Sequence, residues 1–246
     1  MTSTGVTVAM VSSEAFRILV INLDRSLDRF AHIKDELGRE WPHAWARIPA
    51  TDGMLLNLGQ FRHRELLKES SDLSRQLTPG EVGAWLSHWR AWRCARFRDY
   101  SGTLILEDDI KLTGGFAKIL ADRLNDLSTT RLNWDVCFLG CLDGLAKWSP
   151  DLSKSSRLPG QFVRLDSTNG GCPGAYGYLL CPSGARMLLR IANVLRIDRP
   201  VDEVMRFAIN SGDLTAVCAS PPLVRHGRTA TGRRFESTIA ISESTS

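Results

Sequence analysis

The stretch that decides the fold is "FRILVINLDRSLDRFAHIKDELGREWPHAWARIPATDG", residues 16–53. Its opening run, 16–23, is apolar and rich in β-branched residues, which predicts a buried strand. A helix is predicted to begin after Ser26 as N-cap and to end at Gly38. A second strand is predicted over 43–50. Two strands joined by a helix make a β-α-β unit, which predicts an α/β fold with a mostly parallel sheet flanked by helices.

The rest of the chain continues to alternate between helix and strand signals. Thr78 and Glu81 stand three residues apart, which predicts a capping box, and Pro79 takes the first position of the helix that follows. We expect the tryptophans of this helix to be core residues. The other predicted elements are strands at 134–140, 174–181 and 214–220 and helices at 182–195 and 199–212.

Length and composition favour one large domain. The chain has 246 residues, of which 43% are hydrophobic and 24% are charged. We expect the domain to cover 16–240, after a flexible N-terminal extension (1–15) and before a frayed tail (241–246). No apolar run approaches the about 20 residues that a membrane span needs, and no signal-peptide pattern opens the chain. We therefore expect a cytoplasmic protein whose six cysteines are free thiols.

The charge distribution says more than the net charge of +4. The segment "RHGRTATGRR", 225–234, is basic and suits a diphosphate, an anionic glycolipid or a membrane surface, so peripheral contact with the inner face of a membrane is one expectation. A solvated loop explains the same arginines equally well. Nucleic acid is not an expected partner, because the chain lacks interleaved aromatic residues and any recognised binding module.

The segment "GTLILEDDIKLT", 102–113, carries the chemistry. A buried apolar strand runs directly into Glu107, Asp108 and Asp109. Ligand sites of open α/β sheets lie beyond the carboxyl ends of strands, and three crowded carboxylates repel one another unless a cation joins them. Mg²⁺ or Mn²⁺ would suit these oxygens and bridge to phosphate. A pair of turn or capping acids explains the pattern equally well.

Two other classes of phosphate-handling enzyme fit less well. A haloacid-dehalogenase phosphatase needs a second Asp two residues after its nucleophile, whereas Ile110 stands at that offset from Asp108. A P-loop is missing as well, since no GxxxxGK[ST] occurs. The acidic triplet is therefore interpreted as the metal-diphosphate site of a nucleotide-sugar transferase.

Seven segments are more informative together than any one of them. They are "VINLDRSLDR" (20–29), "RIPATDG" (47–53), "LTPGEVGAWLSHWRAW" (77–92), "LILEDDI" (104–110), "WDVCFLG" (134–140), "GAYGYLLCPSGARMLL" (174–189) and "RPVDEVM" (199–205). Their order resembles glycosyltransferase family 25, which includes bacterial lipooligosaccharide galactosyltransferases and collagen galactosyltransferase domains. The resemblance covers about 16–240 and implies a GT-A-like α/β domain.

The resemblance also implies a reaction and a donor site. The reaction is inverting, metal-dependent transfer of a sugar, often galactose from UDP-galactose, to a hydroxyl of a glycan or glycolipid such as lipooligosaccharide. Arginines after the first strand could hold diphosphate oxygens. The donor-binding residues implied in this way are Asn22, Arg25, Asp28, Arg29, Asp52, Ser87 and Asp108.

The metal and catalytic residues are implied in the same way. Glu107 and Asp109 match the acidic metal-binding motif, and His226 is either a third ligand or a phosphate contact. His88 matches the Ser-His pair of the family, although its spacing alone fits a core histidine as well. Inverting transfer needs a base for the acceptor proton, and Asp202 matches an acidic position of the family.

Two alternatives stay open. Asp202 can instead be a first-turn acid that completes a helix cap, in which case Asp143 and Asp166 are the next candidates for the base. The whole chain can also be a non-catalytic carbohydrate- or glycolipid-binding relative of the same fold. The three crowded carboxylates argue against that second alternative, because binding alone does not need them.

Overall fold

The computed structural model describes residues 15–68, 75–97, 99–141, 157–167, 172 and 174–226. The tail expected at 241–246 lies outside these residues, as does the extension expected at 1–15 except for Ala15. Asp143 and most of the basic segment 225–234 also lie outside them.

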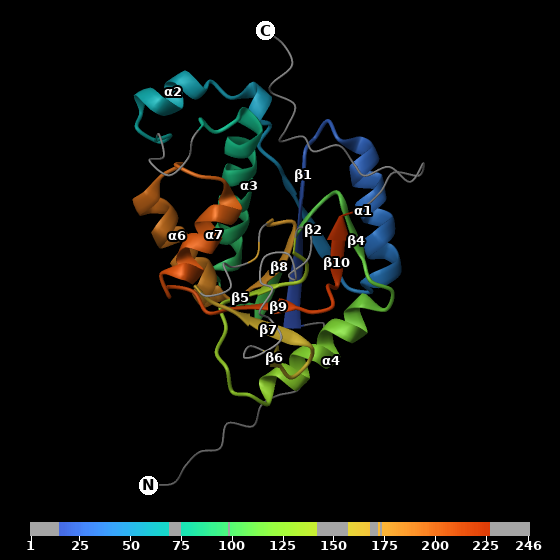
Figure 1. The fold of residues 1–246 in the computed structure, drawn as a ribbon. Coiled ribbons are helices and arrows are strands. Elements are labelled where there is room, and N and C mark those ends of the chain that lie inside the picture. The colour runs from blue at the N-terminus through green and yellow to red at the C-terminus, as the bar shows by residue number, and fades with distance from the viewer. Residues whose placement is uncertain are drawn as a thin grey trace.

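An eight-stranded sheet forms the centre of the molecule (Figure 1). Its strands, in spatial order, are β2 (Trp45–Pro49), β1 (Phe16–Asn22), β3 (Gly102–Glu107), β8 (Gly177–Leu180), β5 (Val136–Phe138), β9 (Ala216–Ala219), β7 (Phe162–Leu165) and β6 (Arg157–Leu158). The pairings make β8 and β7 run against the other strands, which share one direction. The predicted mostly parallel α/β sheet is confirmed.

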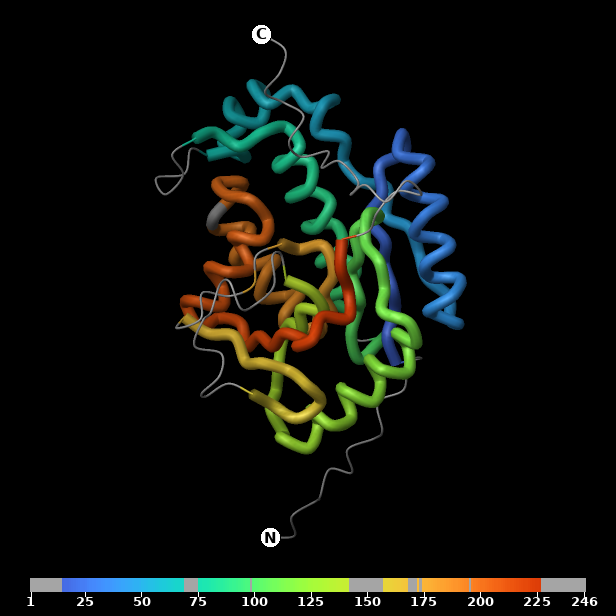
Figure 2. The backbone as a smooth tube through the Cα atoms, turned by 45° about the vertical axis from the view of Figure 1, so that its right-hand side comes forward, coloured from blue at the N-terminus to red at the C-terminus, as the bar shows by residue number. Residues whose placement is uncertain are grey.

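Helices cover both faces of this sheet (Figures 1 and 2). One face carries α3 (Pro79–Ala95), α6 (Pro182–Leu195) and α7 (Val201–Asn210), and the other carries α1 (Leu27–Glu40) and α4 (Phe116–Ser128). The smaller elements are the 3-10 helix η2 (Gly53–Leu55), the helix α2 (Leu58–His63) and a two-stranded sheet of β4 (Ile110–Leu112) and β10 (Val224–His226).

The two helical layers enclose two separate apolar cores. Successive side chains of β1 alternate between them: Leu19 and Ile21 pack on the α3 side, whereas Ile18 and Val20 pack on the α1 side. A strand that is buried on both faces reads as a continuous apolar run, which is why 16–23 gave a clear signal.

The first helix begins where it was predicted but ends later than predicted. Ser26 occupies the N-cap position, but its side chain makes no capping hydrogen bond. The helix passes through Gly38 and continues to Glu40. It ends at Trp41, whose backbone is extended (φ −137°, ψ 101°), because the following Pro42 disfavours the helical conformation of the residue before it. Proline, rather than glycine, ends this helix.

The third helix begins where it was predicted. Thr78 Oγ1 accepts from the Glu81 amide at 3.2 Å, and Glu81 Oε2 accepts from the Thr78 amide at 2.8 Å, which confirms the capping box. The segment between β2 and α3 contains η2 and α2. Among the described residues, no helix is long and apolar enough to cross a membrane, and no disulfide joins the six cysteines, all of which are described.

Candidate active site

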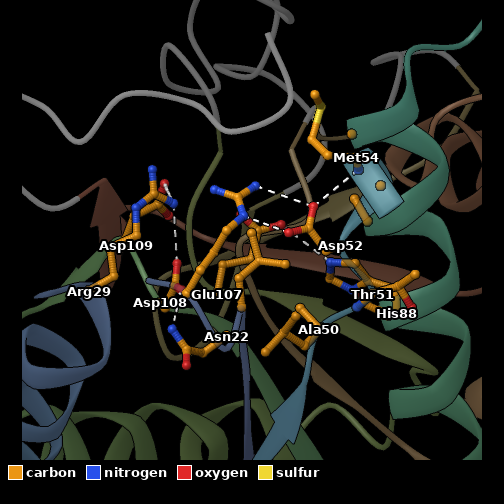
Figure 3. Close-up of a pocket in the computed structure, with 17 residues that line it drawn as sticks. Asn22, Arg29, Ala50, Thr51, Asp52, Met54, His88, Glu107, Asp108 and Asp109 are labelled. Carbon is orange, nitrogen blue, oxygen red and sulfur yellow. Dashed lines mark hydrogen bonds and ion pairs between the residues drawn. The ribbon is translucent and has the colours of Figure 1, made fainter. Parts of the chain in front are cut away.

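A pocket opens at the carboxyl ends of β1, β2 and β3, beside the N-terminal half of α3 (Figure 3). Its empty volume is about 680 Å³, including the open mouth. The side chains that line it come from the segment after β1, the turn after β2, α3 and the acidic segment 107–109. The sheet topology therefore brings together the polar residues that follow three neighbouring strands, as expected for an α/β ligand site.

The turn after β2 is fastened to α3. Ser87 Oγ accepts from the Thr51 amide at 2.8 Å and donates to the Gly83 carbonyl at 2.7 Å. A Cβ on Gly83 would lie 2.6 Å from the Thr51 carbonyl oxygen, and one on Gly53 would lie 1.8 Å from that of Pro79. The backbones approach this closely only because both positions are glycine. Ser87 thus positions the turn that carries Asp52.

Asp52 and Arg25 form an ion pair across the pocket. Nε of Arg25 lies 2.6 Å from Oδ2 of Asp52, and Nη2 lies 3.3 Å from Oδ1. The hydrogen bond from Arg25 holds the pKa of Asp52 below its ordinary value. The Arg25 side chain is 49% exposed, so its guanidinium can turn toward a ligand. Both residues line the pocket.

The acidic segment leaves the strand as soon as its carboxylates begin. β3 ends at Glu107, and Asp108 and Asp109 form a turn before β4. The three side chains therefore do not alternate between two faces, as they would if the strand continued. Asp108 accepts from Nδ2 of Asn22 at 2.6 Å and lies 3.3 Å from Nη1 of Arg29. Burial raises the pKa of Asp108 even though these two contacts lower it. Asn22 and Arg29 therefore stabilise this carboxylate.

Asp109 is the least satisfied carboxylate of the pocket. Its Oδ2 lies 3.4 Å from Nη1 of Arg29, whereas its buried Oδ1 has no hydrogen-bond partner. Burial, followed by the negative charge of Glu107, raises its pKa to about 7. A buried oxygen without a partner is rare, and a bound cation would remove the penalty.

These residues fit a divalent cation. Glu107 and Asp109 supply carboxylate oxygens next to a pocket wide enough for phosphate, which is a common way of holding Mg²⁺ through one or two carboxylates and the substrate. Within the described part of the chain, no group of three or more His, Cys, Asp or Glu side chains is arranged to hold a metal by itself. The donor set is therefore a partial one that a diphosphate would complete.

His88 connects Glu107 to the interior. Its Nε2 lies 3.3 Å from Oε1 of Glu107, and its Nδ1 lies 2.8 Å from the hydroxyl of Tyr178. Burial, the largest influence, acts to raise the pKa of Glu107, but the hydrogen bond from His88, together with the nearby His226 and Arg29, lowers it overall. His88 lines the pocket while 99% of its surface is buried, so the core and site interpretations both describe it.

His226 lies next to the acidic segment, although no sequence spacing indicated it. β10 pairs antiparallel with β4, which puts His226 opposite Ile110, the residue after Asp109. The His226 ring packs on Tyr176 at 4.4 Å between centroids, and its charge influences Glu107. His226 does not line the pocket described above.

Three other predicted residues lie away from the pocket lining. Asp28 is exposed in the first turn of α1 and is not a lining residue of the pocket. Asp202 accepts from the Gly174 amide at 3.1 Å and from the Glu203 amide at 3.1 Å. Asp166 follows β7 and is also not a lining residue. The structure thus does not bring Asp28 into the pocket, because that side chain is exposed on its helix.

Two residues that sequence reasoning missed support the site. Arg47 donates from Nε to Oδ1 of Asn22 at 2.8 Å, which fixes the amide that faces Asp108. Tyr178 sits in an apolar strand that gave no sign of a polar role. Only Arg47 had a usable signal, since it stands within the family-like segment 47–53 after the first helix.

These features define an α/β protein with an acidic, arginine-containing ligand pocket at the carboxyl ends of parallel strands. The family model described as "Glycosyltransferase family 25 (LPS biosynthesis protein)" matches residues 15–205, and the chain belongs to this family. The observed architecture agrees with the GT-A-like α/β class that the sequence resemblance implies.

Two human relatives illustrate the range of the family. Procollagen galactosyltransferase 2 is 29% identical over 226 residues, which are 84% of this chain and 34% of the relative. Inactive glycosyltransferase 25 family member 3 is 31% identical over 193 residues, which are 76% of this chain and 31% of the relative. The chain spans about a third of the length of each relative.

Solved glycosyltransferases align only loosely with this fold. Galactosyltransferase LgtC in complex with donor and acceptor sugar analogs gives a TM-score of 0.41 at 8% identity, over 82% of this chain and 72% of that chain. Mouse xyloside xylosyltransferase 1 gives 0.37 at 11% identity, over 81% and 82%. Similarity at this level carries no argument about the site.

Proposed function

We propose that the chain is an inverting, metal-dependent glycosyltransferase that moves a sugar from a UDP-sugar to an acceptor hydroxyl. The observation that carries the proposal is Asp109, whose buried Oδ1 has no partner at the wall of an open pocket. A fold without a ligand at this place would gain by replacing that carboxylate with an uncharged side chain. Family membership supplies the reaction class.

The donor site is proposed from the charges at the pocket. Arg25, which is half exposed and pairs with Asp52, can turn its guanidinium to diphosphate oxygens. Asp52 can then accept from ribose or base groups. Mn²⁺ or Mg²⁺, held by Glu107 and Asp109, would neutralise the charge that develops on the leaving diphosphate.

The chemical step needs a base on the acceptor side. The acceptor oxygen attacks the anomeric carbon, the bond from that carbon to the UDP oxygen breaks, and the acceptor proton passes to a carboxylate. We propose Asp202 for this role. Its two oxygens each accept one backbone N–H, which orients the carboxylate and leaves further lone pairs for a proton. Gly174, which it holds, lies two residues before Tyr176, whose carbonyl accepts from the Glu107 amide at 2.9 Å.

The transferred sugar, the acceptor and the cellular location are proposed from similar proteins and not from contacts in the pocket. Galactose is proposed as the transferred sugar because the human relative is named a galactosyltransferase. A glycan or glycolipid such as lipooligosaccharide is proposed as acceptor because the family is described as an LPS biosynthesis protein family. We also propose that the protein is cytoplasmic and contacts the membrane peripherally.

The experiment is a panel of UDP-sugars incubated with the protein, with and without Mn²⁺. Release of UDP should require both Mn²⁺ and one preferred sugar, and the signal should increase when the correct acceptor is added. Absence of metal-dependent UDP release with every sugar, together with absence of UDP binding by calorimetry, would contradict the proposal.

A second candidate is a non-catalytic relative that binds a nucleotide sugar or glycan without turnover. Two observations favour it: one relative is named inactive, and Asp108 is already engaged by Asn22 and Arg29. The same calorimetric experiment separates the two functions. Metal-dependent UDP binding without UDP release from any donor would support the non-catalytic protein.

A further inference from the structure

A line of hydrogen bonds runs from the core to the pocket. The indole N–H of Trp92 donates to the Tyr178 hydroxyl at 2.9 Å, this hydroxyl lies 2.8 Å from Nδ1 of His88, and Nε2 of His88 lies 3.3 Å from Oε1 of Glu107. Trp92 and His88 stand four residues apart on α3, so both face the same point of β8. Trp92, Tyr178 and His88 are almost completely buried, whereas the Glu107 side chain is 26% exposed.

The donors and acceptors of this line can be assigned. An indole nitrogen only donates, so the Tyr178 oxygen must accept from Trp92. If His88 Nδ1 also carried a proton, two donors would face one oxygen and the Tyr178 hydrogen would have no acceptor in a fully buried place. Tyr178 therefore donates to Nδ1. In the neutral imidazole the proton then sits on Nε2 and is directed at Glu107.

We propose that Tyr178 is a positioning residue: it locks His88 in the Nε2–H tautomer and thereby fixes which oxygen of Glu107 is free for a ligand. Oε1 accepts from His88, while Oε2 makes no hydrogen bond within the described part of the chain, and Glu107 lines the pocket. The lock itself follows from the buried contacts. Its consequence for the metal and donor rests on the proposed function.

The chain offers a matched control for this assignment. Trp85 lies on the same helix, is buried like Trp92, and has an indole nitrogen without a hydrogen-bond partner. Replacing either tryptophan with Phe removes the same group from the same helix. Only the change at Trp92 removes the donor that forces the Tyr178 hydroxyl to point at His88.

The test is the ring ¹⁵N spectrum of histidine-labelled protein at about pH 8, where an ordinary histidine is neutral. His88→Gln identifies the His88 signals among those of the five histidines. The wild-type protein should show His88 as the Nε2–H tautomer. Tyr178→Phe should add the Nδ1–H form, Trp92→Phe should shift the signals in the same direction by a smaller amount, and Trp85→Phe should leave them unchanged.

Glu107→Ala separates the two possible origins of the tautomer. The side chain lies at the pocket wall, so its truncation leaves the core packing in place. The Nε2–H form should persist, because Tyr178 still donates to Nδ1. An Nδ1–H form in the wild type, loss of the Nε2–H form in Glu107→Ala, or an unchanged spectrum in Tyr178→Phe would each overturn the proposal.

Calorimetry tests whether the contact between Tyr178 and His88 affects ligand affinity. UDP affinity in the presence of Mn²⁺ should fall about tenfold in Tyr178→Phe and stay unchanged in Trp85→Phe, because residues that orient a metal ligand affect metal affinity by roughly that factor. Equal affinities in the wild type and Tyr178→Phe would overturn the functional consequence. If the wild type does not bind UDP at all, the proposed function fails, while the spectra still decide the tautomer.

Discussion

Two buried acidic regions of this protein behave in opposite ways. At the start of α3, Glu81 accepts two hydrogen bonds from Arg75 (2.8 and 2.6 Å) and one from the Thr78 amide (2.8 Å). Burial alone would raise the pKa of Glu81, but these partners lower it below its ordinary value. At the end of β3, Asp109 has a buried oxygen without a partner and a pKa raised to about 7.

The difference separates an acid that builds the fold from acids that we propose bind a ligand. Glu81 is charged because the folded chain supplies a guanidinium and an amide for it, so its charge stabilises the folded state. In the acidic segment 107–109, by contrast, Asp108 and Asp109 share the guanidinium of Arg29, and Glu107 meets the imidazole of His88. Unbalanced buried acids in an open pocket are the pattern expected of a functional site.

The largest expected effect tests this contrast directly. Asp109→Asn keeps the shape of the side chain and removes its charge, so sugar transfer should fall by about 10³-fold or more and Mn²⁺-dependent UDP binding should be lost. The free energy of unfolding, measured with urea at about pH 8, should stay the same or rise, because a poorly satisfied buried charge is gone. Loss of stability with retained activity would reverse the roles assigned to the two regions.

Asp202 sharpens the comparison, because its two backbone contacts resemble those of a structural acid. If it is the base, Asp202→Asn should lower turnover by about 10²-fold with donor affinity nearly unchanged, since the change acts on the chemical step. Steady-state kinetics and calorimetry measure the two quantities. Retained turnover with reduced stability would instead group Asp202 with Glu81, and Asp166 would be the next described candidate.

The two arginines of the pocket should affect different properties: UDP binding depends more on Arg25, and stability depends more on Arg29. Arg25 is half exposed, so Arg25→Ala should weaken UDP binding about tenfold, an effect of the size expected for one charge-assisted contact, and leave stability nearly unchanged. The Arg29 side chain is only 10% exposed and faces two carboxylates, so Arg29→Ala should cost about 3 kcal/mol of unfolding free energy. Calorimetry and urea unfolding should therefore rank the two variants in opposite orders.

Much of this architecture could be predicted from local sequence. The strand 16–23 and the capping box at Thr78 are set by neighbours in the chain, namely an apolar run and two side chains one turn apart. The end of α1 could not be placed correctly, because the effect of Pro42 on Trp41 outweighed the freedom of Gly38. Short elements such as β6 carry too few residues for a periodic pattern.

The position of the acidic pocket could be predicted from the sheet topology, but the hydrogen-bond and ion-pair partners of its side chains could not. Arg29 meets Asp108 and Asp109 across about 80 positions of the chain, a contact that only the packing of α1 against the strand ends creates. The hydroxyl of Tyr178 belongs to a strand whose signal is purely apolar. Periodicity identifies the face on which a residue lies, whereas hydrogen-bond partners depend on which elements pack together.

The smallest expected effect concerns the structural acid. Glu81→Gln removes the charge that Arg75 and Thr78 stabilise, so the unfolding free energy at about pH 7 should fall by about 1 kcal/mol, while UDP binding stays as in the wild type. Because the folded-state pKa of Glu81 is lowered, its contribution is complete above the ordinary value of 4.5 and disappears as the pH falls through the lower folded-state value.

The wild type and Glu81→Gln should therefore differ at about pH 7 and converge in urea unfolding as the pH falls below 4.5. Asp122→Asn is the matched control, because Asp122 pairs with Lys118 at 2.6 Å on the exposed face of α4, where such pairs contribute little. A Glu81→Gln difference that stays constant with pH would mean that the hydrogen-bond geometry of Glu81, and not its charge, starts the helix. The contrast with Asp109 would then be one of packing rather than of charge.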